Sequence, residues 1–274
     1  MEHQPFSVAI SVYKSDNPVF FDRALESITD CQTVKPNEIV LVVDGPVPNE
    51  INMVIDKYAL NYCFKVIRLE KNNGLGNALK IATENSSNEL IARMDSDDIS
   101  LPTRFEEQLL CFKRWPEVDI VGGNITEFID QEENIVARRI VPTSNKDIRE
   151  YMKKRCALNH VSVMFKKSSV MSAGGYKDWF WNEDYYLWIR MWLNNAVFAN
   201  TGTDMVNVRT GLNMYARRGG IKYYKSEKKL QQFMLQNKMI GFTRYLMNCT
   251  KRFIVQCVFP NSIRGWVYRK IARR

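Results

Sequence analysis

The sequence predicts an α/β fold in which a mostly parallel sheet is flanked by helices and followed by a basic helical extension. Short apolar segments rich in Val and Ile alternate with helical patterns through the first half of the chain. Three of the first four apolar segments end in polar or glycine-containing turns, where open α/β sheets hold their ligands. The 274 residues are 45% hydrophobic and 25% charged, which is a globular composition.

Four strands and two helices are expected in the first half. The first strand covers 6–12, and the second, 38–43, is an almost uninterrupted apolar run of the kind buried on both faces of a sheet. Between them, a turn at 15–18 precedes a helix with an apolar inward face formed by Phe21, Leu25 and Ile28. The remaining elements are strands at 64–69 and 90–94 and a helix that opens at 72–76 and runs to about Glu84.

The second half of the chain has a less regular pattern. Apolar segments at 120–129 and 135–141 are joined through a polar stretch, which indicates a hairpin. Helical patterns near 145–154 and 183–193 flank the other expected features, a strand at 161–165 and a turn at Gly174-Gly175.

Charge is divided sharply along the chain, whose net charge is +9. Residues 209–274 hold 16 Lys and Arg but a single acid, Glu227, and carry +15, whereas residues 1–208 carry −6. This break predicts a domain at 1–208 and a basic extension at 209–274. Such an extension suits nucleic acid, an anionic membrane or another acidic partner, and a solvated face is the plain alternative.

The pattern within the extension favours the membrane. Ile263, Trp266, Val267 and Ile271 recur at helical spacing with Arg and Lys mostly elsewhere on the wheel, and an aromatic on a narrow apolar stripe suits a membrane interface. Upstream, 253–259 is apolar around most of the wheel and could lie in the bilayer surface or pack on the body. A packed terminal helix pair is the alternative. No nucleic acid partner is expected, because neither zinc-finger spacing nor an aromatic RNA-binding signature is present.

The sequence predicts a cytoplasmic protein associated peripherally with the inner membrane. No segment approaches the ~18 to 20 apolar residues of a membrane-spanning helix, and residues 1–5 lack the pattern of a secretion signal. The six cysteines form no Cys-x-x-Cys pair and the chain has only two histidines, so neither a disulfide scaffold nor a structural zinc site is expected.

Asp95-Ser96-Asp97-Asp98 is the strongest local signal for chemistry. Three carboxylates within four residues at a strand end repel one another unless a cation or hydrogen-bond donors compensate, which points to a bound divalent metal. Mg²⁺ or Mn²⁺ keeps open positions for phosphate oxygens and therefore suits a diphosphate ligand. The alternative is a solvated acidic turn in which Asp98 or Ser100 caps the helix that begins near Leu101.

Asn182-Glu183-Asp184 is the second group of interest. Asn182 suits the N-cap of the helix at 183–193, so the two acids fall in its first turn near the positive end of the dipole. That placement keeps Asp184 ionised and able to accept a proton. Ordinary charge complementarity at a helix start is the alternative.

In order, the motifs are Asp44 at the second strand end, Asn73-Gly74, the segment Arg93-Met94-Asp95-Ser96-Asp97-Asp98, Gly174-Gly175-Tyr176, and the segment from Asn182 to Arg190. Over residues 5–210 this order resembles the family 2 glycosyltransferases, which have the A-type nucleotide-sugar fold (GT-A). Each motif is loose, but their joint order and spacing are specific.

The resemblance implies roles for individual residues. Asp44 is similar to the carboxylate that hydrogen-bonds the uracil ring, with Ser11, Tyr13 and Arg93 also at the nucleotide. Asp95 and Asp97 resemble the Asp-x-Asp pair, with Asp97 on the metal and Asp95 near the ribose or in the metal shell. Asp184 is similar to the catalytic base, and Glu183 would position the acceptor or the base. The first strand ends in Ser11-Val12-Tyr13-Lys14 rather than the family's Pro-x-Tyr-Asn, and Val43-Asp44-Gly45 replaces Asp-Asp-Gly.

The closer resemblance is to bacterial transferases of O-antigen, capsule and exopolysaccharide (amylovoran-type) assembly, carried by 159–165 and 260–268. It implies an inverting, Mn²⁺- or Mg²⁺-dependent transfer of glucose or galactose from a UDP-sugar to GlcNAc or GalNAc linked through diphosphate to undecaprenol. His160 is equally compatible with a structural role and with an acceptor contact.

Two other functions fit parts of the pattern. A haloacid-dehalogenase-type phosphatase also has Asp-x-Asp after an apolar strand, as in Asp95 and Asp97, but the residue two beyond the second Asp is Ile99 rather than Thr or Val, and the motif follows three strands instead of one. A non-enzymatic membrane- or nucleic-acid-binding adaptor would use the basic extension alone. The presence of Asp95, Asp97 and Asp184 argues against it.

Overall fold

The first half of the chain folds as the predicted alternation of strands and helices. A computed structural model describes residues 3–211 and 219–260. Its first elements are β1 (Phe6–Val12), α1 (Pro18–Ile28), β2 (Glu38–Val43), α2 (Asn49–Ala59), β3 (Phe64–Arg68), α3 (Leu75–Asn85) and β4 (Leu90–Met94). All four predicted strands and both predicted helices are confirmed, whereas α2 has no counterpart in the sequence prediction.

The second half contains shorter elements and one long strand. They are β5 (Ile99–Ser100), α4 (Arg104–Arg114), β6 (Ile120–Phe128), β7 (Ile135–Arg139), α5 (Asn145–Met152), β8 (Met164–Lys166), α6 (Lys167–Ser172), α7 (Glu183–Leu193) and β9 (Phe198–Arg209). The β6–β7 hairpin is confirmed, with antiparallel pairing. The expected strand at 161–165 is corrected, because its first part is a 3₁₀ turn, η1 (His160–Ser162).

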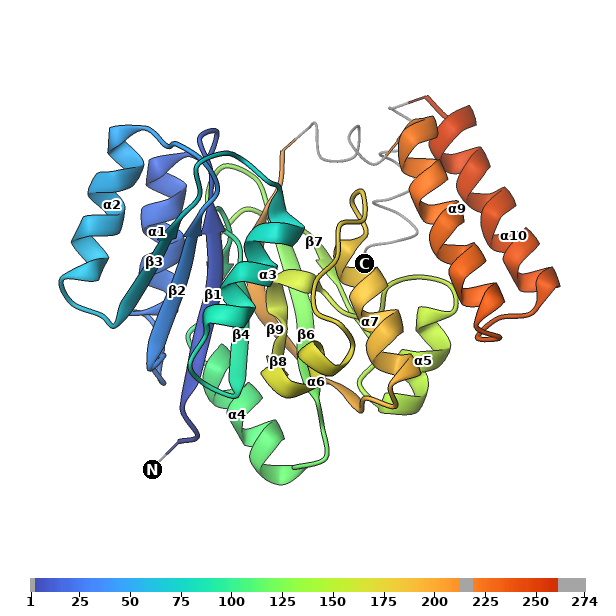
Figure 1. Ribbon diagram of the computed structural model, residues 1–274, viewed down its shortest axis with the longest axis horizontal. Helices are drawn as coiled ribbons and strands as arrows, with labels where there is room; N and C mark the ends of the chain where they lie inside the picture. The colour runs from blue at the N-terminus through green and yellow to red at the C-terminus, as the bar shows by residue number, and fades with distance from the viewer. Residues whose placement is uncertain (1–2, 212–218, 261–274) are drawn as a thin grey trace.

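The strands form one nine-stranded sheet in the order β3-β2-β1-β4-β8-β6-β9-β5, with β7 on β6 (Figure 1). β3, β2, β1 and β4 are parallel to one another, as predicted. From β8 onward the sheet is mixed: β8 is antiparallel to both β4 and β6, and β6 is parallel to β9. The carboxyl ends of β1, β2 and β4 therefore meet at one edge.

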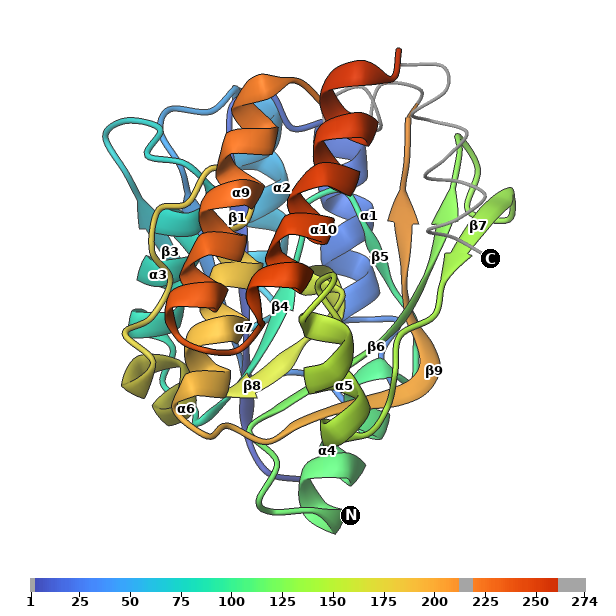
Figure 2. The ribbon, with the colours of Figure 1, turned by 90° about the vertical axis from the view of Figure 1, so that its right-hand side faces the viewer.

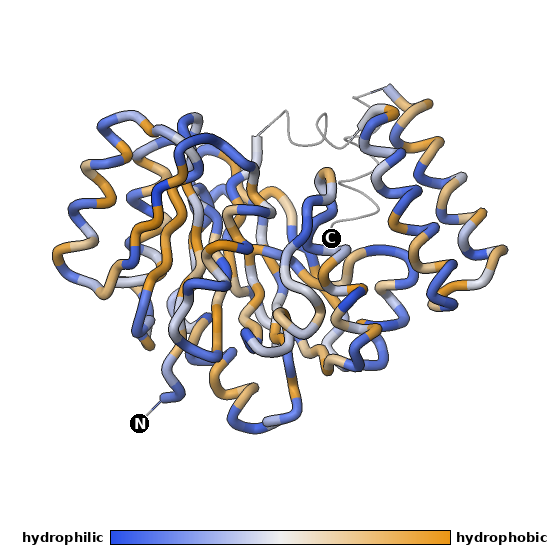
Figure 3. Tube along the Cα trace, viewed as in Figure 1, coloured by the Kyte–Doolittle hydropathy of each residue, from blue (hydrophilic) through white to orange (hydrophobic). Residues whose placement is uncertain are grey.

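The central strands are buried on both faces, which explains their continuous apolar sequences. Val8 and Ile10 of β1 pack with α1, α2 and α4, whereas Ala9 between them packs with α3 and α7 on the other face. Figure 3 shows hydrophobic residues concentrated along these strands. Because successive side chains of a strand point to opposite faces of the sheet, β1 contributes to both apolar clusters.

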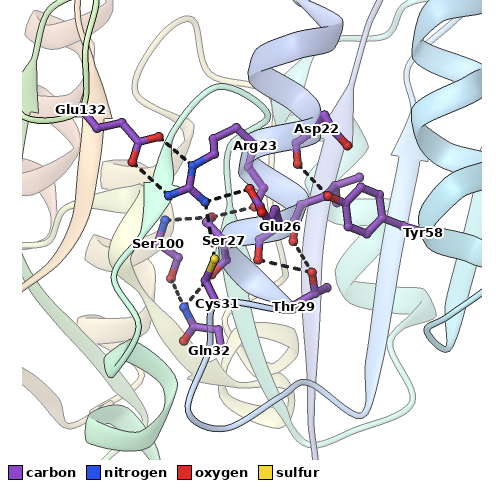
Figure 4. A network of polar contacts seen from close by, with 12 residues as sticks. Asp22, Arg23, Glu26, Ser27, Thr29, Cys31, Gln32, Tyr58, Ser100 and Glu132 are labelled. Carbon is purple, nitrogen blue, oxygen red and sulfur yellow. Dashed lines mark hydrogen bonds and ion pairs between the residues drawn. The ribbon is translucent and has the colours of Figure 1, made fainter.

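The first helix fixes the segment that follows the acidic motif. The Ser27 hydroxyl accepts a hydrogen bond from the Ser100 amide at 3.0 Å, and the Gln32 amide donates to the Ser100 hydroxyl at 3.2 Å (Figure 4). On the same helix Arg23 forms an ion pair with Glu132, in the loop between β6 and β7, with 2.6 Å between Nε and Oε1. These contacts tie the two halves of the sheet together close to Asp95–Asp98.

Two helices follow the sheet, α9 (Ile221–Gln236) and α10 (Phe242–Phe253), and α10 continues into a π turn, η2 (Ile254–Val258). Figures 1 and 2 show them as an adjacent pair in front of α7, at the end of the molecule opposite α2. Leu230 and Met234 of α9 pack into the same apolar cluster as Trp188 of α7. The domain boundary near 209 stays a prediction, and the apolar stripe predicted in 261–274 lies outside the described residues.

None of the helices in residues 3–211 and 219–260 has the length and hydropathy needed to cross a bilayer. All six cysteines lie in the described residues as free thiols.

Candidate active site

The residues predicted at the nucleotide lie along the carboxyl edge of the parallel strands. Ile10 of β1 is opposite Met94 of β4, so Ser11, near the end of β1, and Asp95, the first residue after β4, lie side by side. β2 ends at Val43, opposite Val12, which brings Asp44 beside Tyr13. Strand register alone thus gathers residues that lie up to 84 positions apart in the sequence.

Arg93 and Asp95 form a bidentate ion pair. The two terminal nitrogens of the buried Arg93 guanidinium donate to the two carboxylate oxygens of Asp95. Behind it, the buried Arg104 donates to the Arg93 carbonyl oxygen at 2.6 Å, and burial together with the charge of Arg93 lowers the pKa of Arg104 to about 9. Arg93 is therefore buried and holds Asp95, and its predicted place at the nucleotide stays a prediction.

Asp97 is the carboxylate with an excess of negative charge around it. Burial, followed by the charges of Asp95 and Asp16, raises its pKa to about 6. Asp16 was not predicted as a site residue. Its carboxylate accepts hydrogen bonds from the Tyr13 amide at 3.0 Å and the Ser96 hydroxyl at 2.8 Å, and burial raises its pKa. Asp16 enters the site through the parallel pairing of β1 with β4, which brings the turn after β1 to the acidic motif.

The third carboxylate of the motif, Asp98, has a structural contact. It accepts a hydrogen bond from the Arg209 amide at 2.9 Å, at the end of β9. The alternative in which Asp98 or Ser100 caps the next helix is wrong, because α4 begins at Arg104 and Thr103 occupies its N-cap. Burial and the neighbouring Asp97 raise the pKa of Asp98 well above its usual value.

Asp44 organises the loop that opens α3. Its two carboxylate oxygens accept hydrogen bonds from the amides of Asn73 at 2.7 Å and Gly74 at 2.9 Å. Gly45 next to it has φ +89°, and a Cβ there would lie 2.7 Å from the Asn72 nitrogen. Only glycine allows this close approach without displacing the loop.

These residues line a cleft of about 840 Å³. Ser11, Tyr13, Asp44, Asp95 and Asp97 form one side of it. The loop before α7 forms the other side, with Tyr176, Trp179, Phe180, Trp181 and Glu183. Most of the residues predicted at a nucleotide-sugar are thus brought together in one cleft.

A second cleft of about 380 Å³ adjoins the first. Asp95, Asp97 and Trp181 line both clefts, whereas Asp184 lines only the second and Glu183 only the first. Trp181 was missed by the sequence analysis. It has φ 60°, which is uncommon for a bulky residue, and its side chain stays exposed at the junction.

Glu183 and Asp184 lie in the first turn of α7, as predicted, but the Asn182 side chain does not cap this helix. Asn182 is in the N-cap position without a side-chain cap hydrogen bond, and its amide donates to the Ser226 hydroxyl of α9 at 3.3 Å. The Glu183 side chain faces the start of α3, where a Cβ on Gly76 would lie 3.5 Å from it. Burial and the charge of Asp184 raise the pKa of Glu183 to about 7.

His160 has a partner within the fold. Its Nε2 lies 2.9 Å from the Tyr176 hydroxyl, and its ring packs edge-on against Trp188. Burial, followed by the charge of Arg93, lowers its pKa well below the usual value. His160 lines neither cleft and supports Tyr176, which does line the first one.

The residues at the junction of the two clefts fit a divalent cation that arrives with a diphosphate. Within the described residues, no group of three or more His, Cys, Asp or Glu is arranged to enclose a metal by itself. Mg²⁺ and Mn²⁺ sites that bind substrate phosphates need only one or two carboxylates. Asp97, with its uncompensated charge, and Asp95 can supply them.

The comparisons with known proteins agree with this fold and site. Residues 7–180 match the family described as Glycosyl transferase family 2. The chain therefore belongs to glycosyltransferase family 2 and is a glycosyltransferase. Crystal structures of Staphylococcus aureus TarS residues 1–349, alone and in complex with UDP-GlcNAc, share the GT-A fold with TM-scores of 0.64 and 0.67 at 15% and 16% identity. Each match covers 98% of this chain, and the matches cover 75% and 76% of TarS residues 1–349, respectively.

Individual relatives match over nearly their whole length. The chain is 36% identical to the amylovoran biosynthesis glycosyltransferase AmsE of Erwinia amylovora, over 97% of this chain and 98% of the relative. It is also 36% identical to the UDP-Gal:alpha-D-GlcNAc-diphosphoundecaprenol beta-1,3-galactosyltransferase of Escherichia coli, over 98% and 97% of the two chains. Membership of this family leaves the phosphatase and adaptor interpretations without support.

Proposed function

We propose that this protein is an inverting, metal-dependent hexosyltransferase. It moves glucose or galactose from a UDP-sugar to a GlcNAc- or GalNAc-diphosphate-undecaprenol acceptor in O-antigen or exopolysaccharide assembly. The observation that carries the proposal is the pair of adjoining clefts that share Asp95, Asp97 and Trp181, with Asp184 facing the second. The name of the Escherichia coli galactosyltransferase supports this class of acceptor, and that of AmsE supports a role in exopolysaccharide assembly.

The first cleft suits the donor. Asp44, Ser11 and Tyr13 lie at its end, where they would contact the uridine, and Asp95 and Asp97 lie at the junction, where the diphosphate would meet the cation. Mn²⁺ or Mg²⁺ bound there would neutralise the charge that develops on the departing diphosphate. Arg93 keeps Asp95 oriented toward the same point.

The second cleft suits the acceptor. Asp184, at the start of α7, would take the proton from an acceptor hydroxyl. The acceptor oxygen then forms a bond to the anomeric carbon while the bond from that carbon to the UDP oxygen breaks on the opposite face. A single in-line displacement inverts the anomeric configuration, and UDP leaves with the bonding electron pair. Glu183 helps to position the acceptor or the base.

The outer face of α10 supports association with an anionic membrane surface on the cytoplasmic side. Phe242, Leu246, Ile254 and Val258 recur at intervals of four or eight residues along α10 and η2 and are all exposed, although a stripe of this kind normally faces a core. Exposed cations lie on the same pair of helices, at Lys222, Lys225, Lys228, Lys229 and Lys251, and in the loop between them, at Lys238. An apolar stripe beside cations is the composition of helices that lie in the interface of an anionic bilayer.

The test is a transfer assay. Purified protein with Mn²⁺ is incubated with UDP-glucose, UDP-galactose or other UDP-sugars, each with a synthetic GlcNAc- or GalNAc-diphosphate-lipid. We expect a product heavier by one hexose that disappears with EDTA, and NMR of the new linkage should show inversion. Absence of product in every pairing, with UDP still bound, would contradict the proposed donor and acceptor.

A further inference from the structure

Trp181 lies where the two clefts meet, three residues before Asp184. Its side chain lines both clefts, whereas its neighbours Trp179 and Phe180 line only the first. The side chain is 46% exposed, although burying an indole removes more apolar area from water than burying most other side chains. A large apolar ring is therefore open to a ligand at the junction.

The backbone at Trp181 has a conformation that bulky side chains rarely adopt. Its φ of 60° is in the left-handed region, where glycine and asparagine are the usual residues. The turn is closed by the Asn182 amide, which donates to the Trp179 carbonyl oxygen at 3.2 Å. Glycine or asparagine would form the same turn with less strain, so an indole at this position points to a role for the ring itself.

Helix α9 holds the turn and orients the ring. The Ser226 hydroxyl donates to the Phe180 carbonyl oxygen at 2.6 Å and accepts from the Asn182 side-chain amide at 3.3 Å. These two partners flank Trp181 in the chain. Tyr223, one turn earlier on α9, meets the indole ring at an angle of 80°, with the ring centroids 6.4 Å apart. The indole is thus exposed and oriented at the same time, which lowers the cost of binding a ligand.

The second cleft adds charged groups of both signs to the aromatic ring. Within the described residues its lining has five carboxylates and four guanidinium groups, those of Asp95, Asp97, Asp98, Asp184 and Glu227 and of Arg139, Arg155, Arg209 and Arg252. The cleft therefore has no excess of positive charge for an anion. A carboxylate has about four lone-pair sites, so it keeps acceptor capacity after one contact. Such a lining suits hydroxyl groups, which both donate and accept.

We propose that Trp181 is the stacking platform for the acceptor sugar. A pyranose ring has an apolar face of C–H groups and hydroxyl groups around its edge, which match an aromatic ring surrounded by polar groups. This inference rests on the proposed function and adds the residue that orients the acceptor ring. Trp181 and Asp184 both line the second cleft, so a ring stacked on the indole there lies beside the base that takes its proton.

The test makes use of the left-handed backbone. Trp181→Gly and Trp181→Asn both remove the ring and both suit a φ of 60°, so the turn can form without the indole. Trp181→Phe keeps an aromatic ring. Trp115 is 41% exposed and lines neither cleft, so Trp115→Asn is the matched control. Tm is measured for every variant, and KM is measured separately for UDP-sugar and for the GlcNAc- or GalNAc-diphosphate-lipid.

We expect Trp181→Gly and Trp181→Asn to raise KM for the acceptor at least about tenfold, since aromatic contact and apolar burial are lost together. KM for UDP-sugar should change by less than about twofold, because the diphosphate and cation hold the donor. Trp181→Phe should recover most of the acceptor affinity, and Trp115→Asn should resemble the wild type. An unchanged KM for the acceptor would overturn the platform. An equal rise for donor and acceptor, or a rise for the donor alone, would overturn it as well.

A binding measurement separates this inference from the proposed function. If the wild type transfers no sugar to either acceptor, the proposed function fails, and fluorine NMR of protein labelled with fluorotryptophan decides the platform alone. The resonance that Trp181→Phe removes belongs to Trp181. With UDP and Mn²⁺ present, methyl glycosides of glucose, galactose, GlcNAc and GalNAc are added in turn, and sorbitol, which has no ring, is the control. A shift caused by a glycoside and not by sorbitol supports the platform. No shift, or an equal shift with sorbitol, overturns it.

Discussion

Both terminal nitrogens of the Arg93 guanidinium donate hydrogen bonds to the carboxylate of Asp95, which lies two residues further along the chain at the end of β4. Side chains at positions i and i+2 of an extended segment point to one side, so the pair forms without distorting the backbone. The consequence is an asymmetric acidic motif: the charge of Asp95 is compensated, whereas that of Asp97 is opposed by Asp95 and Asp16, with its pKa at about 6. Asp95 and Asp97 therefore differ in how far their negative charge is compensated.

We expect Asp97→Asn to abolish Mn²⁺-dependent UDP binding and to lower kcat/KM by at least about 100-fold, because the cation loses the carboxylate with the excess charge. Calorimetry with UDP, with and without Mn²⁺, measures the first effect. Asp56→Asn, on the exposed side of α2, is the matched control. Circular dichroism should show an intact fold. Retained activity with metal would remove Asp97 from the cation site.

Asp184→Asn should keep the binding of UDP-sugar and lose turnover by at least about 100-fold, since an amide cannot take the proton. The split between an unchanged donor affinity and a lower kcat is the readout. The residue faces the second cleft only, so the donor cleft stays complete. A near-normal rate would move the catalytic base to another residue.

Glu183 makes stability depend on pH. Its pKa is about 7 in the folded chain, above the ordinary value of 4.5, so the folded state binds more protons than the unfolded state between these values. The cost of ionising it is therefore absent below pH 4.5 and complete above pH 7. Glu183→Gln should raise Tm relative to wild type more at pH 8 than at pH 5. A Tm difference independent of pH would contradict the raised pKa.

The exposed face of α10 can be tested with vesicles. Phe242→Ser with Leu246→Ser should weaken binding to anionic vesicles at least about tenfold, because each change removes apolar area from the interface. Met53→Ser with Leu60→Ser is the control, since these side chains on and just after α2 are equally exposed at the opposite end of the molecule. Equal binding by the two double variants would exclude α10 as the membrane-facing helix.

The local patterns of the sequence sufficed for the four parallel strands of the first half. Strands such as β2 are apolar at every position because both faces are buried, and the turns after them contain the polar residues of the site. Helix α2 was not predicted, although Ile51, Ile55 and Tyr58 recur at helical spacing on its buried side. β9 was not predicted because its twelve residues mix Thr, Asn and Gly with few buried apolar positions.

The candidate site was predictable where it depends on single strand ends and not where it depends on long-range pairing. Asp95, Asp97 and Asp184 stand out in local motifs. Asp16 and Arg139 enter the site only through contacts between distant strands, and a single sequence carries no local pattern for such contacts. Arg93 lies beneath Asp95 because its side chain is buried, and the charge of an arginine alone would not predict that burial.

Helix α10 has two faces with different surroundings. Arg252 on the inner side lines the second cleft, and Phe242 and Leu246 on the outer side are exposed. An α-helix with its side chains is about 10 to 12 Å thick. If a lipid layer lies against the outer face of α10, a substrate anchored in that layer has to reach past the width of this one helix to meet Asp184. Its hydrocarbon tail can stay in that layer while only the polar head enters the protein.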